Sequence, residues 1–305
     1  MAVAQSAAGG SESSAVPRTP WGDPDLQGVW DYRNITPLER PRELGDREFY
    51  TEEEIAELEG RAAERLDNPP DENTPANLVH APYATDPGRF VDEARRTSLI
   101  VEPSNGRMPE LTAAAQERQA ANRGQGFGGR GADSYTDRTL LERCITRGLP
   151  GALLPGLYNN NIEIVQAPGM VAIIHEMVHE TRIIPLDGTE YSGLRGYMGE
   201  SRGHWDGDTL VIETKNFNDQ VSYRGSTEDL KLTERYTRIG PDQIAFSMTF
   251  DDPNQWVEPW TVAYSMRPTQ GDLYEYACHE GNYGLRNILQ NARDEERAAA
   301  EAAGN

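Results

Sequence analysis

The sequence predicts a mainly β fold, an antiparallel barrel or strongly bent sandwich preceded by an N-terminal wrap of helices and loops. From residue 157 onward apolar and polar residues alternate, with turn signals about every 8 to 12 positions, as in an antiparallel meander. Two further short strands are expected at 26–32 and 99–101. About eight or nine strands are then available, enough to close a barrel and remove exposed edges. The 305-residue chain is long enough to bury a substantial core, and we expect a single domain over 21–296.

The N-terminal residues 1–20 are small, polar and proline-containing, and we expect them to be disordered. They begin with Met-Ala-Val-Ala, which is similar to the end of a secretory cleavage site, and a Gly/Ser-rich stretch follows. We therefore expect Met1 to stand near a natural cleavage point and the protein to be exported to a periplasm or the medium.

Helices are expected in the wrap over 21–156 and at the C-terminus. Residues 50–66 form the clearest one, because Thr51 can cap it, three glutamates follow at its positive end, and apolar residues lie on one face. A second helix is expected at about 112–122. A short amphipathic helix begins at residue 287 and frays into a tail at 297–305.

The stretch RGQGFGGRGADS contains Gly124-x-Gly126-x-x-Gly129, the spacing of a dinucleotide-binding turn. That turn needs an entering strand and a departing helix, so that the pyrophosphate meets the helix N-terminus. Here a helix precedes the glycine stretch, and no helix is predicted to follow it. The stretch is therefore interpreted as a flexible loop.

The meander over 157–283 divides into apolar-alternating segments. They are NIEIVQA, MVAIIHEMVHETRIIPL, HWDGDTLVIETKNF, LKLTERYTRIG, QIAFSMTFDDP, PWTVAYSMRP and LYEYACHEG. In two of them the even-numbered positions are large and apolar, which predicts either a packed core or the wall of an apolar cavity. These positions are Ile244, Phe246, Met248, Phe250, Trp260, Val262, Tyr264 and Met266.

The charge and composition of the chain limit the classes of partner and cofactor that it can bind. The formal net charge is −21, and such a surface repels nucleic acid and anionic membranes, so we expect neither as a partner. No run of about 18 apolar residues is present, which excludes a transmembrane helix. No P-loop, G-x-S-x-G elbow, C-x-x-C pair or EF-hand loop occurs, and we expect no cofactor and no metal.

Two cysteines, Cys144 and Cys278, are 134 positions apart. In an oxidising compartment an isolated pair of this kind favours one long-range disulfide, which would join the middle of the chain to its last strand. Two buried free thiols are the alternative.

The letters HEMVH, from His175 to His179, match the H-E-x-x-H pattern of zinc peptidases. That chemistry needs a helix, on which both imidazoles reach one zinc. The surrounding residues are rich in Val, Ile and Thr and predict one long strand over 171–184, in which four residues span about 13 Å. His175 and His179 then share one face, while Glu176 and Arg182 share the other. Only one face can point inward, and either assignment is open.

Ligand-binding candidates lie near the predicted barrel rim. An aromatic pair beside carboxylates is typical of sites for sugar rings or aromatic ligands, and the candidates are Asp252, Trp256, Trp260 and Tyr264. Near the C-terminus His279 and Glu280 follow Cys278. If Cys278 pairs with Cys144, Arg143 and Arg147 come close to them and form a polar site.

The pattern Gly28-x-Trp30 ahead of a meander resembles the opening of lipocalin-like (calycin) barrels. The segments PDLQGVW, RCITRGLPG, MGESRGHWDGDTLVIETKNF and YEYACHEGNYG together resemble a widespread group of exported bacterial proteins for which no activity is assigned. The first resemblance implies a barrel that holds a small ligand. Lipocalin-like barrels include both carriers and enzymes such as hydratases, decarboxylases and cyclases.

The leading functional hypothesis is an exported, cofactor-independent enzyme that performs acid–base chemistry in a barrel cavity, as a lyase, isomerase or hydrolase. Its substrate is a small aromatic, terpenoid or glycosidic molecule. His175 and His179 are the expected proton carriers, because histidine titrates near neutral pH, and Arg182 or Glu176 is the charge partner. The alternatives are a non-catalytic periplasmic carrier of a small hydrophobic ligand and a zinc-dependent hydrolase.

Overall fold

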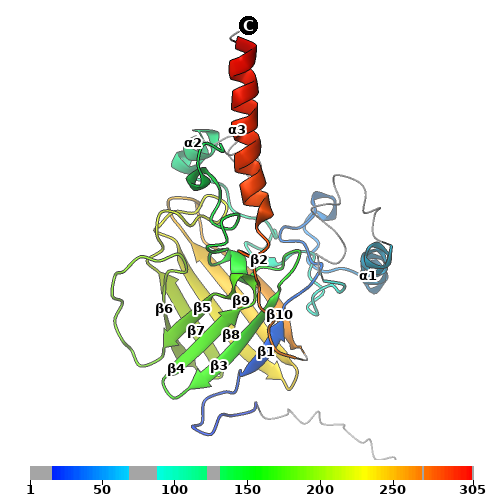
Figure 1. The fold of residues 1–305 in the computed structure, drawn as a ribbon. Coiled ribbons are helices and arrows are strands. Elements are labelled where there is room, and N and C mark those ends of the chain that lie inside the picture. The colour runs from blue at the N-terminus through cyan, green and yellow to red at the C-terminus, as the bar shows by residue number, and fades with distance from the viewer. Residues whose placement is uncertain (1–15, 69–87, 122–130, 270, 304–305) are drawn as a thin grey trace, which may run out of the picture.

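The computed structural model describes residues 16–68, 88–121, 131–269 and 271–303, and it shows a nine-strand antiparallel sheet bent nearly into a barrel (Figure 1). The strand order is β5-β4-β3-β1-β10-β9-β8-β7-β6, and a short β2 pairs with β10. The strands are β1 (Gly28–Asp31), β2 (Ile100–Glu102), β3 (Asn161–Ala167), β4 (Met170–His175), β5 (Thr181–Pro185), β6 (Glu200–Asp206), β7 (Thr209–Lys215), β8 (Lys231–Gly240), β9 (Gln243–Asp251) and β10 (Trp260–Pro268). The predicted mainly β class is confirmed.

The sheet has a seam between its edge strands β5 and β6. Every neighbouring pair in the nine-strand order is antiparallel, so these two edges run in the same direction. In the described chain no backbone ladder joins them. Gly203 of β6 lets them approach, because a Cβ there would lie 2.6 Å from Leu186 Cδ2 and 3.0 Å from Ile184 Cγ2. Side chains therefore close the barrel at the seam.

The barrel interior is a packed core. The alternating apolar residues of β9 and β10 that the sequence singled out are all buried, and Phe250 stacks on Trp260 with ring centroids 3.8 Å apart. These two residues are also register partners in the sheet. Burying each such side chain stabilises the fold by about 1.5–3 kcal/mol. Of the two interpretations of this surface, the packed core is the one that the structure shows.

Among the described residues, three α-helices lie outside the barrel: α1 (Glu52–Asp67), α2 (Ala113–Ala121) and α3 (Tyr283–Ala303). Thr51 caps α1 as predicted, in a reciprocal capping box with Glu54. The first two helices agree with the predicted ranges within two residues. In Figure 1 α3 projects away from the barrel. It continues to Ala303, so the predicted tail at 297–305 is wrong for residues 297–303.

Other local predictions need correction. Residues 16–20, expected to be disordered, lie on the barrel: Arg18 pairs with Pro24 in an isolated bridge and Thr19 is buried. The segment 273–281, expected to be the last strand, is turn and irregular structure. The predictions for residues 1–15 and for the Gly124–Gly129 loop lie outside the described residues. No helix in the described ranges has the length and apolar composition needed to cross a membrane.

A segment that we call the plug (residues 144–154) fills one end of the barrel, the end where β4 finishes and β5 begins, here named the upper end. Its short helical turn η4 (Gly151–Leu153) turns carbonyl groups towards the strands. The Ala152 carbonyl accepts a hydrogen bond from Tyr32 Oη at 2.8 Å, and the Leu153 carbonyl accepts one from Tyr264 Oη. Ala152 and Leu153 are fully buried. The plug therefore closes the core at this end.

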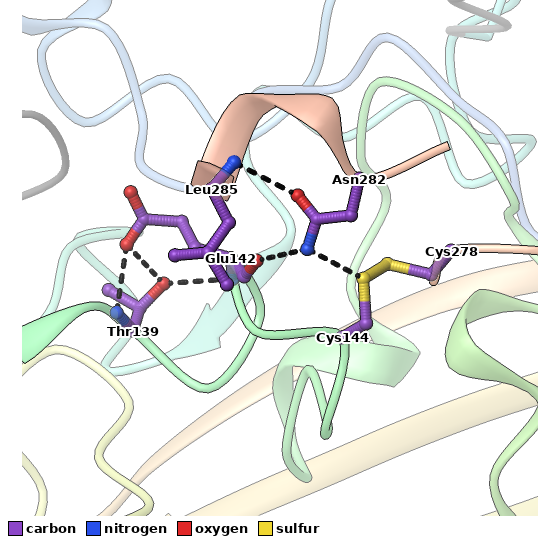
Figure 2. Close-up of a disulfide and its surroundings, with 6 residues drawn as sticks. All are labelled: Thr139, Glu142, Cys144, Cys278, Asn282 and Leu285. Atoms are coloured by element: carbon purple, nitrogen blue, oxygen red, sulfur yellow. Dashed lines mark hydrogen bonds between the residues drawn. A yellow bond between two sulfur atoms is a disulfide. The ribbon is translucent and has the colours of Figure 1, made fainter. Parts of the chain in front are cut away.

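The predicted disulfide between Cys144 and Cys278 is present, with the two Cα atoms 5.7 Å apart (Figure 2). Cys278 lies in the turn before α3 and not in a strand, so the disulfide joins the plug to the base of that helix. Asn282 strengthens the junction: its Nδ2 donates to the Glu142 carbonyl at 2.8 Å, and its Oδ1 accepts from Leu285 N and caps α3.

Candidate functional site

The H-E-x-x-H segment forms the turn of a hairpin. β4 ends at His175, the short helical turn η5 (Met177–His179) follows, and β5 returns antiparallel to β4. Val178 occupies this turn with φ +58°, a conformation that β-branched residues rarely adopt. The predicted single strand over 171–184 is therefore wrong. Its Val, Ile and Thr content belongs to two strands, and the turn between them carries no Gly, Pro or Asn signal.

The hairpin brings His175 and Arg182 to the same side. Ile173 pairs with Arg182 in the register of β4 and β5, so Arg182 points to the barrel interior together with His175. His175 is fully buried and Arg182 is 4% exposed. The expectation that these two residues lie on opposite faces is wrong, because it assumed an unbroken alternation through the turn.

His175 and Arg182 belong to an interior cluster (His175, Arg182, Glu234 and Tyr236). Arg182 Nη1 and Nη2 donate to the two carboxylate oxygens of Glu234 at 2.7 and 2.8 Å, a bidentate pair. Tyr236 Oη donates to the same carboxylate at 2.8 Å. Arg182 Nε donates to His175 Nε2 at 3.3 Å, so the ring proton is on Nδ1, which faces the Ala152 carbonyl at 3.3 Å.

The protonation states of the cluster follow from burial and charge. Burial, and then the positive charge of Arg182, lower the pKa of His175 to about 3, so the ring is neutral near pH 7. Burial opposes the charge of Arg182, but the Glu234 carboxylate outweighs it and raises the pKa of the guanidinium. Burial and Glu234 raise the pKa of Tyr236 well above its usual range. The cluster is thus one ion pair with two neutral neighbours.

The cluster acts as a strut across the barrel interior. It connects the edge strand β5, through Arg182, to β8, through Glu234. Of the five principal hollows of the described residues, none is lined by His175, Arg182 or Glu234. The sequence did not single out Glu234, because its partner is distant in the chain and acidic side chains are common on outward strand faces.

The other predicted catalytic residues are placed differently. Glu176 is 7% exposed, and its Oε2 accepts hydrogen bonds from Asn161 Nδ2 at 2.7 Å and Asn161 N at 3.3 Å. It therefore fastens the start of β3 to the end of β4. The backbone of His179 ends η5, and its side chain lies outside the described structure.

The ligand-binding residues predicted near the barrel rim are mostly buried, and one of them borders the surface. Trp260 and Tyr264 are core residues, and burial raises the pKa of Tyr264 well above its usual range. Asp252 is 2% exposed, and its carboxylate accepts hydrogen bonds from the Thr227 and Asn254 backbone N–H groups, which fixes a turn. Trp256 lies at the edge of the core and borders a surface groove.

The predicted pair His279 and Glu280 is exposed on the turn that follows the disulfide. Neither residue lines a principal hollow of the described structure. Arg143 and Arg147, expected nearby, both line a hollow of about 420 Å³ beside the plug. Arg143 also lies over the Tyr135 ring, with its Cζ 5.2 Å from the centroid.

The largest of the principal hollows is a groove of about 860 Å³ at the upper end, which we call the upper groove. It lies between α2, the loop 219–228 and the Gln255–Trp256 turn. Apolar side chains of Met108, Leu111 and Trp256 form part of its wall, and charged side chains form the rest. The charged members are Glu39, Arg118, Asp219, Arg224 and Glu228.

A smaller hollow of about 380 Å³ adjoins the upper groove at Arg224, and we call it the arginine pocket. Arg147 from the plug, Tyr223 and Arg224 provide its polar wall. The remaining described lining residues include no aspartate or glutamate; they are Asn34, Ile35, Thr36, Leu38, Leu99, Gly151, Leu154 and Pro155. Sequence reasoning missed Tyr223 and Arg224, which lie in an irregular loop without a recognisable motif.

Comparison of the chain with protein-family models, with curated proteins and with solved structures finds no match. The resemblances to lipocalin-like barrels and to exported bacterial proteins therefore stay predictions from the sequence. The geometry of the upper end is the basis for a functional conclusion.

Proposed function

We propose that the protein binds a small organic molecule at the upper end of its barrel and functions as a carrier. The observation that carries this proposal is the upper groove of about 860 Å³, which combines Trp256, Met108 and Leu111 with a charged rim. Binding sites for small molecules are concave and join apolar walls to a few polar groups that orient the ligand. The barrel interior is filled by side chains, so the ligand binds at its end.

The interior cluster gives the reason to prefer a carrier over the acid–base enzyme. The enzyme hypothesis assigns proton transfer to His175, and a general base must come within about 3 Å of its substrate. His175 is fully buried, and its two ring nitrogens face Arg182 and the Ala152 carbonyl. The same contacts occupy the atoms that a zinc-dependent hydrolase would use as ligands.

Export of the protein belongs to the same proposal. The Cys144–Cys278 disulfide is of a kind that persists in oxidising compartments such as a periplasm or the extracellular medium.

A pair of tryptophan substitutions on α2 tests the proposal. Gln119 is exposed and lines the upper groove, whereas its neighbour Ala120 is exposed and does not line it. We expect Gln119→Trp to fill the groove and weaken binding of the best ligand from a panel of small aromatic, terpenoid and glycosidic compounds. Ala120→Trp is the matched control. Isothermal titration calorimetry measures the affinities.

Two results would contradict the proposal. One is equal ligand affinity in Gln119→Trp and Ala120→Trp, which would place binding elsewhere. The other is recovery of a chemically altered ligand after incubation with the wild-type protein, as detected by mass spectrometry, which would restore the enzyme hypothesis.

A further inference from the structure

Arg147 is a half-buried positive charge that has no hydrogen-bond acceptor or ion-pair partner within the described part of the chain. Its neighbour Thr146 has such a partner: the Thr146 hydroxyl donates to Glu180 Oε2 at 2.6 Å. Arg182 in the barrel, by contrast, has a bidentate carboxylate partner. A guanidinium without a counter-charge in a concave site attracts an anion.

The chain leaves room for this guanidinium. A Cβ on Gly156 would lie 2.6 Å from Arg147 Nη2, and a Cβ on Gly151 would lie 3.4 Å from Arg147 Cγ. Neither glycine has a positive φ, so backbone conformation does not require glycine at these positions. Because both glycines lack a Cβ, the Arg147 side chain can pack against them and extend into the arginine pocket.

A second arginine and a tyrosine line the same space. Arg224 lines the pocket, and its Nε donates only a long hydrogen bond, of 3.4 Å, to Tyr223 Oη. Burial raises the pKa of Tyr32, Tyr223 and Tyr276, and the nearby charge of Arg147 acts in the opposite direction on each. Arg147 thus lies near three tyrosines, one of which lines the pocket, and has no carboxylate among the pocket's lining residues.

The pocket also differs in charge from the rest of the molecule. The chain has 50 acidic and 29 basic residues, yet the described lining of this pocket contains two arginines and no acidic side chain. A concave site with charges of one sign concentrates the field and attracts a counter-ion of the opposite sign. The negative surface around it repels polyanions, which limits the ligand to a small anion.

We infer that the arginine pocket binds the oxyanion head group of a small organic acid, a carboxylate or a phosphate monoester, through Arg147 and Arg224. The planar guanidinium fork fits both head groups. Leu38, Leu99 and Leu154 contact the apolar body of the ligand, which extends towards the upper groove past Arg224. This inference rests on the proposed function and adds the chemical class of the ligand.

The test uses four probes and isothermal titration calorimetry of the full chain with its disulfide intact. Phenylacetate and phenyl phosphate present the two head groups, phenylacetamide is the neutral counterpart, and inorganic phosphate lacks an organic body. We expect at least one organic anion to bind about tenfold or more tightly than phenylacetamide, since a charge-assisted pair is stronger than a neutral hydrogen bond. Comparison of the two organic anions identifies the head group.

Two variants report on the pocket itself. Arg147→Gln removes the charge, and Gly156→Ala keeps Arg147 but displaces its guanidinium. We expect each to weaken anion binding by about tenfold or more. Their controls are Arg286→Gln and Gly284→Ala, both at exposed positions of α3. Thermal unfolding of Arg147→Gln adds a second readout: a structural arginine would lower Tm, whereas an unpaired binding arginine leaves it unchanged or raises it.

Each outcome decides the inference. Equal affinity for phenylacetate, phenyl phosphate and phenylacetamide overturns the anion specificity and leaves the proposed small-molecule binding intact. Anion affinity unchanged in both Arg147→Gln and Gly156→Ala also overturns it, because the head group then binds elsewhere. Absence of binding by either organic anion at about 10 mM overturns it as well, since even a weak site is occupied at that concentration. Loss of all binding in Gln119→Trp, with unchanged anion affinity in Arg147→Gln, overturns the inference and supports the proposed binding in the upper groove.

Discussion

At the scale of single residues, the partners of a buried charge distinguish a structural role from a binding role. Near the upper end Arg182 is buried and Arg147 is half-buried, but Arg182 donates to a carboxylate and an imidazole while Arg147 has no such acceptor among the described residues. Sequence alone singled out Arg182 as a charge partner for catalysis. It could not show that Glu234 would satisfy that charge, since the two residues are 52 positions apart.

The neutral state of His175 predicts a pH dependence of stability. The folded-state pKa is about 3, below the ordinary value of 6.5, so between these values the unfolded chain binds a proton that the folded chain does not. The contribution of His175 is therefore fully present above about pH 6.5 and is lost as the pH falls towards 3. We expect the free energy of unfolding to decrease by on the order of 3 kcal/mol from this residue between about pH 7 and pH 4.

Urea unfolding of the wild type and of His175→Gln at both pH values measures this contribution. The variant should lose less stability on acidification than the wild type does. His204→Gln replaces an exposed histidine and is the control for removal of an imidazole. Parallel loss of stability in the wild type and His175→Gln would show that His175 is not held neutral by burial.

At the scale of elements, the period-two alternation predicted the strands well and the turns poorly. β3 and β8–β10 agree closely with their sequence segments, because each alternates over seven or more residues. The β4–β5 hairpin was missed, because Val178 adopts a positive φ that its side chain does not signal. The start of α3 was predicted too late in the chain, because the aromatic residues before it are typical of a strand. In the structure the disulfide and the Asn282 cap hold this segment.

The strut between β5 and β8 gives a prediction for the edge strand. Glu234→Gln leaves the Arg182 guanidinium buried without a carboxylate, and we expect a loss of about 3–5 kcal/mol of unfolding free energy. Amide hydrogen exchange should accelerate first in β5, which has a ladder on one side only. The exposed pair Arg235–Asp206 supplies the control, since Asp206→Asn removes a solvent-exposed ion pair and should change the unfolding free energy far less.

A loss in Glu234→Gln no larger than that in Asp206→Asn would contradict the strut. The double variant Arg182→Met/Glu234→Leu refines the interpretation. Because it removes both charges together, it should recover much of the lost stability.

At the scale of the whole molecule, a nearly closed nine-strand sheet has an interior that its own side chains fill, and the largest of the principal hollows lies at its upper end, between α2 and two loops. The sequence predicted the class of fold, the core faces of β9 and β10, and the disulfide. It placed the ligand inside the barrel, because alternation reveals which residues face inward but not whether they leave a cavity. The upper groove and arginine pocket are built from α2 and from loops far apart in the chain, which local patterns do not bring together.

The most direct test of the account is a crystal structure of the protein with bound phenylacetate or phenyl phosphate, whichever binds more tightly. We expect the anionic head group to contact the guanidinium groups of Arg147 and Arg224 and the ring to lie between the arginine pocket and the upper groove. A ligand inside the barrel beside His175 and Tyr236, or one bound at a site that touches neither arginine, would contradict it.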